Sequence, residues 1–273
     1  MASHAPRLIA NALLSPAPED RTASGTHFLD LDFADLSEES ALRLIASRGE
    51  SVPFSYVVTP NVDHMVRLQQ QRSDLWPVYR AAWLTLCDSR ILSALARSTG
   101  KTIQAVPGSD LTAAILGKAI MPGDRIAIIG GNATMIERLC KKFGLGNVIH
   151  HNPPMGFVND AAAMERAVAF AIEARARYTF LAVGSPQQEI LAYRIARSER
   201  AVGTGLCIGA SLEFLTGDQR RAPVIVQKLA LEWLFRLATN PSRLTQRYLV
   251  DGPRIFPIFN RWRARAADTS SAR

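Results

Sequence analysis

Apolar residues recur along this chain in two patterns that take turns. Short, nearly continuous or period-two apolar runs are typical of strands, and apolar residues spaced three or four apart are typical of helices. The predicted strands cover residues 27–33, 55–59, 83–89, 125–131, 147–152, 178–186 and 202–210. Predicted helices include residues 41–46, run through Met65 and Leu68, start at Ser109, cover 133–144 and 160–177, and lie between 186 and 202. The alternation predicts an α/β fold with a Rossmann-like, doubly wound, mostly parallel sheet.

The first of these segments carries a D-x-D pair. Residues 27–33 read HFLDLDF, which predicts one period-two strand with Asp30 and Asp32 on the same face. Such a pair binds a divalent ion in many nucleotide-sugar enzymes, but this one precedes the alternating core, which disfavours a metal site. His64, His150 and His151 lack ligand spacing with any carboxylate, so they too favour a surface or supporting role over metal binding. Asp35 and Glu38 then predict a capping box for the helix that includes residues 41–46.

Size and composition describe a globular protein. The 273 residues are enough for one large or two modest domains, and 48% of them are hydrophobic. Three widely spaced cysteines form neither a CxxC nor a Cys/His cluster, which argues against disulfides and zinc and favours a reducing, cytoplasmic setting. No apolar run approaches the ~20 residues needed to cross a bilayer. Residues 1–25 are broken by prolines and acidic residues and predict a flexible arm rather than a signal peptide.

Positive charge is concentrated at the C-terminal end. Between Arg220 and Arg265 there are ten basic and two acidic residues, so this stretch carries a charge equal to the +8 of the whole chain. Gly217 is the candidate boundary between a core domain, residues 26–217, and a basic helical appendage, residues 218–273. An amphipathic helix with Trp233 on its apolar face is predicted within the appendage. A basic, tryptophan-bearing segment suits an anionic surface, either lipid headgroups or a phosphorylated substrate.

Polar residues and glycines follow four of the predicted strands. In a doubly wound sheet, ligands bind beyond the carboxyl ends of the strands, so these residues are candidates for a site. They are Thr59 and Asn61, then Asp88, then Gly130 and Gly131, and finally Gly184, Pro186, Gln188 and Glu189.

Each candidate has a structural alternative. Asp88 can be a general base that takes a proton from a sugar hydroxyl, or a helix cap. The Gly130–Gly131 turn can present backbone N–H groups to a phosphate, or be only a tight turn, since it is not GxGxxG and no Walker lysine follows. Gln188 can bind a sugar or phosphate, or belong with Glu189 to a solvated first helical turn.

These motifs together resemble one family. In order, the chain carries T-x-N at 59–61, Asp88 after an apolar strand, VPGSDL at 106–111, IIGG at 128–131, GF at 156–157, VGSPQQE at 183–189 and RAP…LEWLFRL…NPxR…RYL at 221–249. The series resembles the WecG/TagA/CpsF glycosyltransferases, glycosyltransferase family 26, over residues 26 to about 250.

The resemblance implies a reaction. The donor is a UDP-sugar carrying a hexose or an N-acetylhexosamine-type sugar, and the acceptor is a polyprenyl-diphosphate-linked saccharide in bacterial surface or exopolysaccharide synthesis. The enzyme is then cytoplasmic and peripheral on the inner face of the cell membrane, held at an anionic surface by the appendage. No cofactor or metal is implied, no nucleic acid is a partner, and the oligomeric state, homo-oligomers included, stays open.

The resemblance also assigns residues. It implies that Asp88 is the base, that Thr59 and Asn61 lie near the donor sugar, and that Gln188 belongs to the catalytic group. On the donor side it places Gly108, Asp110, Gly130, Gly131, Gly156, Phe157, Gly184, Pro186 and Glu189. The appendage, with Arg221 and Arg236, is implied to close the site, where the two arginines stabilise the leaving diphosphate.

The chain departs from the family pattern at three positions. Ser89 replaces the usual glycine after the aspartate, Gln187 replaces the usual lysine of P-K-Q-E, and Ala105 holds a place that is often basic. These departures leave the donor sugar open more than the reaction class. Two other functions are weighed against it: a nucleotide- or nucleic-acid-binding module that uses the basic tail, and an NAD-dependent enzyme, which lacks the full glycine fingerprint.

Overall fold

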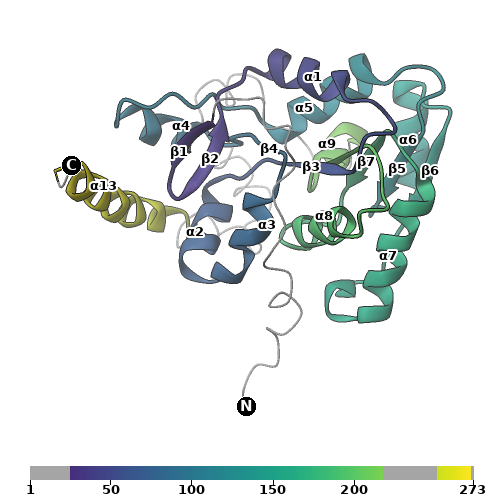
Figure 1. Ribbon diagram of the computed structural model, residues 1–273. Helices are drawn as coiled ribbons and strands as arrows, with labels where there is room; N and C mark the ends of the chain where they lie inside the picture. Colours follow the sequence, from purple (N-terminus) through teal and green to yellow (C-terminus); the bar gives the residue numbers. More distant parts are fainter. Residues whose placement is uncertain (1–24, 218–250, 272–273) are drawn as a thin grey trace.

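The computed structural model describes residues 25–217 and 251–271, with side chains through Ala266 (Figure 1). Its centre is a six-stranded sheet in the order β4-β3-β8-β7-β5-β6, in which every strand pair is parallel. The strands are β3 (Ser55–Val58), β4 (Leu84–Thr85), β5 (Ile126–Ile129), β6 (Val148–His151), β7 (Tyr178–Leu181) and β8 (Thr204–Cys207). The predicted Rossmann-like, doubly wound α/β fold is confirmed.

Helices cover both faces of the sheet, as Figure 1 shows. One face carries α2 (Val62–Gln70), α3 (Trp76–Arg80), α7 (Ala161–Ala174) and α8 (Gln187–Arg197). The other carries α1 (Glu38–Ser47), α5 (Gly108–Ala114), α6 (Ala133–Phe143) and α9 (Ser211–Thr216). The remaining helices are α4 (Arg90–Arg97) and α13 (Ile255–Ser271), with short turns η1 (Ser73–Leu75), η2 (Ile115–Ala119), η3 (Phe157–Asn159) and η5 (Gly252–Arg254).

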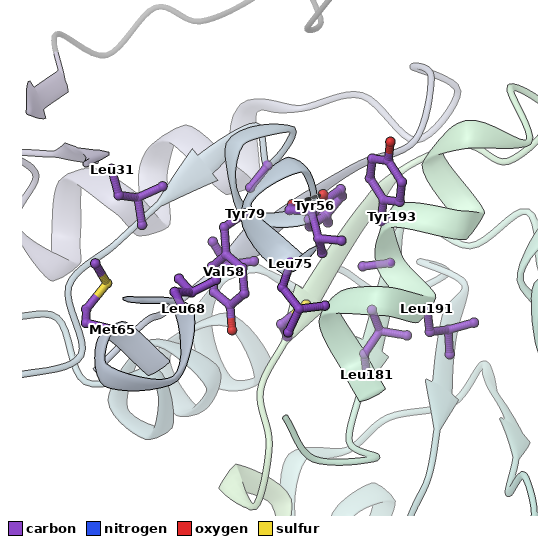
Figure 2. Packing of buried hydrophobic residues seen from close by; sticks show 14 of the residues in the cluster. Leu31, Tyr56, Val58, Met65, Leu68, Leu75, Tyr79, Leu181, Leu191 and Tyr193 are labelled. Carbon is purple, nitrogen blue, oxygen red and sulfur yellow. Dashed lines mark hydrogen bonds between the residues drawn. The ribbon is translucent and has the colours of Figure 1, made fainter. Parts of the chain in front are cut away.

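The core lies in two layers, one on each face of the sheet. In the layer under α2, α3 and α8, Tyr56 of β3 packs with Tyr79 of α3 and Leu191 of α8, and all three are buried (Figure 2). The Tyr56 hydroxyl donates to the carbonyl of Val78, so this tyrosine satisfies its polar end inside the apolar layer. The packing fixes α2 and α8 against the sheet, and both helices begin at its carboxyl edge.

The single strand predicted over residues 27–33 is wrong. The segment is an antiparallel hairpin of β1 (Gly25–Phe28) and β2 (Leu31–Ala34), with Leu29 and Asp30 in the turn at φ of 50° and 65°. Asp30 therefore lies in the turn, while Asp32 lies on β2 with its Oδ1 accepting from His27 Nδ1 at 2.7 Å. The two carboxylates do not share one face of one strand.

The predicted capping box of α1 is also wrong. Ser37 caps the helix, its Oγ accepting from the backbone N–H of Ser40 at 3.1 Å. Asp35 lies too far ahead of the first turn and instead accepts from the backbone N–H of Gln104 at 3.2 Å. Asp35 thus ties the start of α1 to the segment that leads into α5.

The last described helix, α13, packs against the hairpin. Its inner face buries Ile255, Ile258, Phe259 and Trp262, and the rings of Trp262 and Phe28 lie 5.2 Å apart, edge to face. Arg265 Nη2 also lies 3.1 Å from Asp30 Oδ2. The distal part of the predicted appendage is thus joined to the core domain, whereas its helix around Trp233 falls outside the described residues. The boundary near Gly217 stays a prediction.

This packing predicts a stability effect. We expect Trp262→Ala to lower the free energy of unfolding by about 3 kcal/mol, since it removes a buried aromatic side chain. Phe256→Ala is the matched control, because Phe256 lies on the outer side of the same helix with 51% of its surface exposed. Urea unfolding of both variants checks this, and equal losses would contradict the packing of α13 on the core.

Within the described ranges, no helix combines the length and apolarity that a membrane crossing requires.

Candidate active site

Thr59, Asp88 and Gly108 meet at the carboxyl edge of the sheet. Thr59 follows β3, Asp88 follows β4, and Gly108 is the first residue of α5. A Cβ on Gly108 would lie 2.9 Å from the Thr59 hydroxyl oxygen and 3.8 Å from Asp88 Oδ2. The Asp88 backbone N–H donates to Pro60 O at 3.0 Å, which joins the two strand exits. The structure therefore brings a hydroxyl and a carboxylate together around a backbone that only glycine leaves uncovered.

Asp88 is not the cap of the next helix. Ser89 caps α4, and its Oγ accepts from the Leu92 backbone N–H at 3.2 Å. Ser89, and not Asp88, is therefore the helix cap. Burial raises the pKa of the Cys87 thiol to about 12, so this cysteine stays protonated at neutral pH and is a poor nucleophile.

The glycines after β5 have a structural reason. Gly130 has a φ of 102°, and a Cβ there would lie 2.6 Å from the carbonyl oxygen of Ala182 in the neighbouring strand exit. Gly131 has a φ of 77°, and Asn132 caps α6 by accepting from the Met135 backbone N–H at 2.9 Å. A tight turn therefore accounts for both glycines, and their role in binding a phosphate stays a prediction.

The segment after β7 brings Gln188 and Glu189 beneath the same edge. Gly184 turns the chain at a φ of 78° with open space around it, and α8 begins after Pro186. Gln188 Nε2 donates to Glu189 Oε1 at 2.8 Å, and Gln188 Oε1 accepts from the Gly209 backbone N–H at 2.7 Å. Both side chains are buried, at 4% and 2% exposure, so neither belongs to a solvated first turn.

The Asn61 side chain is held by contacts with the first turn of α2. It caps α2, with its Oδ1 accepting from the backbone N–H of Asp63 at 3.1 Å and lying 2.7 Å from His64 Nδ1. The His64 Nε2 lies 3.7 Å from Glu189 Oε1. Polar contacts thus run from the exit of β3 to the exits of β8, which pairs with β3, and β7, which pairs with β8.

Five predicted donor-side residues remain to be located. Asp110 lies in the first turn of α5 and is half-buried. Gly156 turns the chain at a φ of 78°, and the Phe157 side chain after it is buried in the core layer. Arg221 and Arg236 lie outside the described residues. The donor-side roles of all five residues stay predictions.

One residue of this centre, His64, is not among the site residues predicted from the sequence. His64 was expected in a surface or supporting role, and it is buried between Asn61 and Glu189. Its signal was the spacing of Asn61 and His64, which places the imidazole at the third position of a helix capped by asparagine. The Asp30–Asp32 metal alternative loses its geometry with the hairpin, and residues 25–217 and 251–266 contain no group of three potential metal ligands.

Comparison with known families agrees with this arrangement. A model described as "Glycosyl transferase WecG/TagA/CpsF family" matches residues 26–269, which is most of the chain and includes every candidate residue named above. With a six-stranded parallel sheet and a polar carboxyl edge already described, the chain belongs to the WecG/TagA/CpsF family of glycosyltransferases.

Proposed function

We propose that this glycosyltransferase moves a hexose or N-acetylhexosamine-type sugar from a UDP-sugar to a polyprenyl-diphosphate-linked saccharide. The observation that supports this best is the meeting of Thr59, Asp88 and Gly108 at the carboxyl edge of the sheet, where doubly wound folds bind nucleotide ligands. The carboxylate and the hydroxyl lie at neighbouring strand exits, so one sugar can contact both.

In the proposed reaction Asp88 takes the proton of the acceptor hydroxyl. The acceptor oxygen forms a bond to the anomeric carbon of the donor sugar, and the bond from that carbon to the UDP oxygen breaks. UDP leaves with the negative charge that the transition state develops on its β-phosphate. Thr59 and Asn61 orient the donor sugar, since Asn61 Oδ1 is already occupied by α2 and leaves its amide N–H groups for a ligand.

The appendage is proposed to complete the site and to hold the enzyme on the membrane. Its net charge of +8 between Arg220 and Arg265 supports attachment to anionic lipid, because each basic residue near such a surface contributes about 1 kcal/mol. Arg221 and Arg236 are proposed to stabilise the leaving diphosphate, since a guanidinium matches two phosphate oxygens. The cytoplasmic face of the cell membrane is where a UDP-sugar and a lipid-linked acceptor meet.

Transfer is expected to be independent of a divalent metal. Arginines and helix N-termini can stabilise the leaving diphosphate in place of an ion. Activity should therefore persist in EDTA, and Asp30→Asn with Asp32→Asn should affect stability more than turnover, because both side chains hold the hairpin region together. Turnover that is lost in EDTA and restored by Mg²⁺ or Mn²⁺ would contradict this.

Nucleotide binding tests the proposal apart from turnover. UDP should raise the melting temperature, because a ligand that binds only the folded state stabilises it, whereas NAD should not. Anionic vesicles should bind the protein in a salt-dependent manner and single-stranded DNA should not. A shift with NAD alone, or binding to DNA alone, would favour one of the two alternative functions.

A further inference from the structure

Glu189 is the most deeply buried charged group in the described part of the chain, and the proposed reaction gives its carboxyl no chemical step. Only 2% of its surface is exposed, and it lies at the start of α8 beneath the carboxyl edge of the sheet. Burying a carboxyl group costs free energy unless the group makes specific contacts, so its surroundings call for an explanation.

The contacts of Glu189 lead to two residues with proposed roles. On one side its Oε1 accepts from Gln188 Nε2, and Gln188 Oε1 accepts from the Gly209 N–H. On the other side the same Oε1 lies 3.7 Å from His64 Nε2, and His64 Nδ1 lies 2.7 Å from Asn61 Oδ1. Glu189 thus contacts Gln188 directly and is linked to Asn61 through His64.

Two contacts join the His64 ring to Asn61. Asn61 Oδ1 accepts from the backbone N–H of Asp63, so this atom is the oxygen of the amide. His64 Nδ1 lies 2.7 Å from that oxygen and 3.2 Å from the backbone nitrogen of Asn61, and the tautomer of the ring decides whether Nδ1 donates to the oxygen or accepts from the N–H. The Nε2 of the ring faces Glu189, so the imidazole lies between the carboxyl group and the asparagine.

Burial raises the pKa of the Glu189 carboxyl, the Gln188 amide and Arg67 opposing that rise. In the hydrogen bond from Gln188 Nε2, the Glu189 carboxyl group is the acceptor. Glutamine has the same shape and keeps that acceptor, so Glu189→Gln is a conservative replacement and Glu189→Ala a disruptive one.

We propose that Glu189 and His64 are positioning residues: Glu189 fixes the Gln188 amide, and His64 fixes Asn61, so that both side chains are held for the donor sugar. This rests on the proposed function, in which Asn61 and Gln188 belong to the site. It replaces the expected donor contact of Glu189 with an indirect role. A displacement of a positioned group by about 1 Å lowers a rate by about 10²-fold.

The test combines kinetics with a readout that needs no turnover. Glu189→Ala should lower kcat by about 10- to 100-fold while the affinity for UDP changes less than about threefold, and Glu189→Gln should restore kcat to within about threefold. Hydrogen exchange of the Gly209 amide, measured by NMR, should speed up in Glu189→Ala and stay slow in Glu189→Gln, since the Gly209 N–H donates to Gln188.

For His64, the same kinetic comparison uses two replacements. His64→Phe removes both ring nitrogens, and it should lower kcat by about 10-fold or more. His64→Asn keeps a polar atom near the Nδ1 position and should lose clearly less of kcat. Leu68→Ala is the matched control, because it removes a buried side chain from the same helix and should reduce stability without changing kcat or Gly209 exchange.

The outcomes distinguish a failure of the positioning role from a failure of the proposed function. If the wild-type protein transfers sugar, and Glu189→Ala keeps a normal kcat and slow Gly209 exchange, the positioning role is wrong. It is also wrong if Glu189→Gln loses as much kcat as Glu189→Ala, or if Leu68→Ala matches both. If the wild type transfers no sugar from any donor, the proposed function fails, while Gly209 exchange still decides whether Glu189 fixes Gln188.

Discussion

Asp88→Asn is expected to give a folded protein that binds UDP and turns over about 10²-fold or more slowly. The loss is the usual scale for removing a positioned general base, because an amide cannot take a proton from the acceptor hydroxyl. Shape is kept, and the backbone bond from Asp88 to Pro60 is unaffected, so the exits of β3 and β4 stay joined. Initial rates at saturating donor, with the UDP affinity measured separately, give the result.

The matched control for this variant is Asp32→Asn. Asp32 is a carboxylate on the β1–β2 hairpin that pairs with His27, and it lies outside the carboxyl edge of the sheet. It should retain nearly full turnover. Near-normal turnover in Asp88→Asn, or a loss that Asp32→Asn reproduces, would remove Asp88 from the proposed mechanism.

Substitutions in the two parts of the appendage are expected to have different effects. Arg221→Gln with Arg236→Gln should lower turnover by about 10²-fold even with a water-soluble acceptor, because removing a group that stabilises developing charge has about that effect. Arg261→Glu with Arg263→Glu should weaken vesicle binding alone, and added salt should weaken the wild-type binding as well. Turnover on the soluble acceptor and vesicle sedimentation measure the two effects.

Point substitutions suit this test better than removal of residues 218–273. Truncation after Gly217 should abolish both activities, but it also removes α13 and exposes the Phe28 surface that Trp262 covers. Arg265 is left unchanged because it pairs with Asp30. Normal turnover of Arg221→Gln with Arg236→Gln on a soluble acceptor would reduce the appendage to an anchor.

The strands of the sheet were predictable from the sequence where they are buried on both faces. Residues 55–59 and 125–131 predict β3 and β5 to within two residues, because SYVV and IAII are apolar runs that only a covered parallel strand requires. The hairpin was not predictable in the same way. Residues 29–33 alternate between apolar and acidic residues as in one strand, and the positive φ of Leu29 in the turn is a conformation that its residue type does not signal.

The candidate site was predictable in its members more than in its contacts. Strand ends located Thr59, Asp88 and Gln188, but sequence position cannot tell which strand exits are neighbours in space. The order β4-β3-β8-β7 makes the exits that carry residues 59 and 88 neighbours, and the exit that carries residue 188 lies two strands from β3. Gln188 and Glu189 are both buried there. A glutamate in a first helical turn is usually solvated, so its burial beside His64 follows from the tertiary packing of α2 and α8.

Sugar transfer by the wild-type protein is the most direct test of the proposed function. A panel of UDP-sugars is offered with a short polyprenyl-diphosphate-linked saccharide in the presence of EDTA, and product is detected by mass spectrometry beside Asp88→Asn. We expect that one or a few donors release UDP and add one sugar to the acceptor, and that the variant does so about 10²-fold more slowly. No transfer from any UDP-sugar, or equal transfer by both proteins, would contradict it.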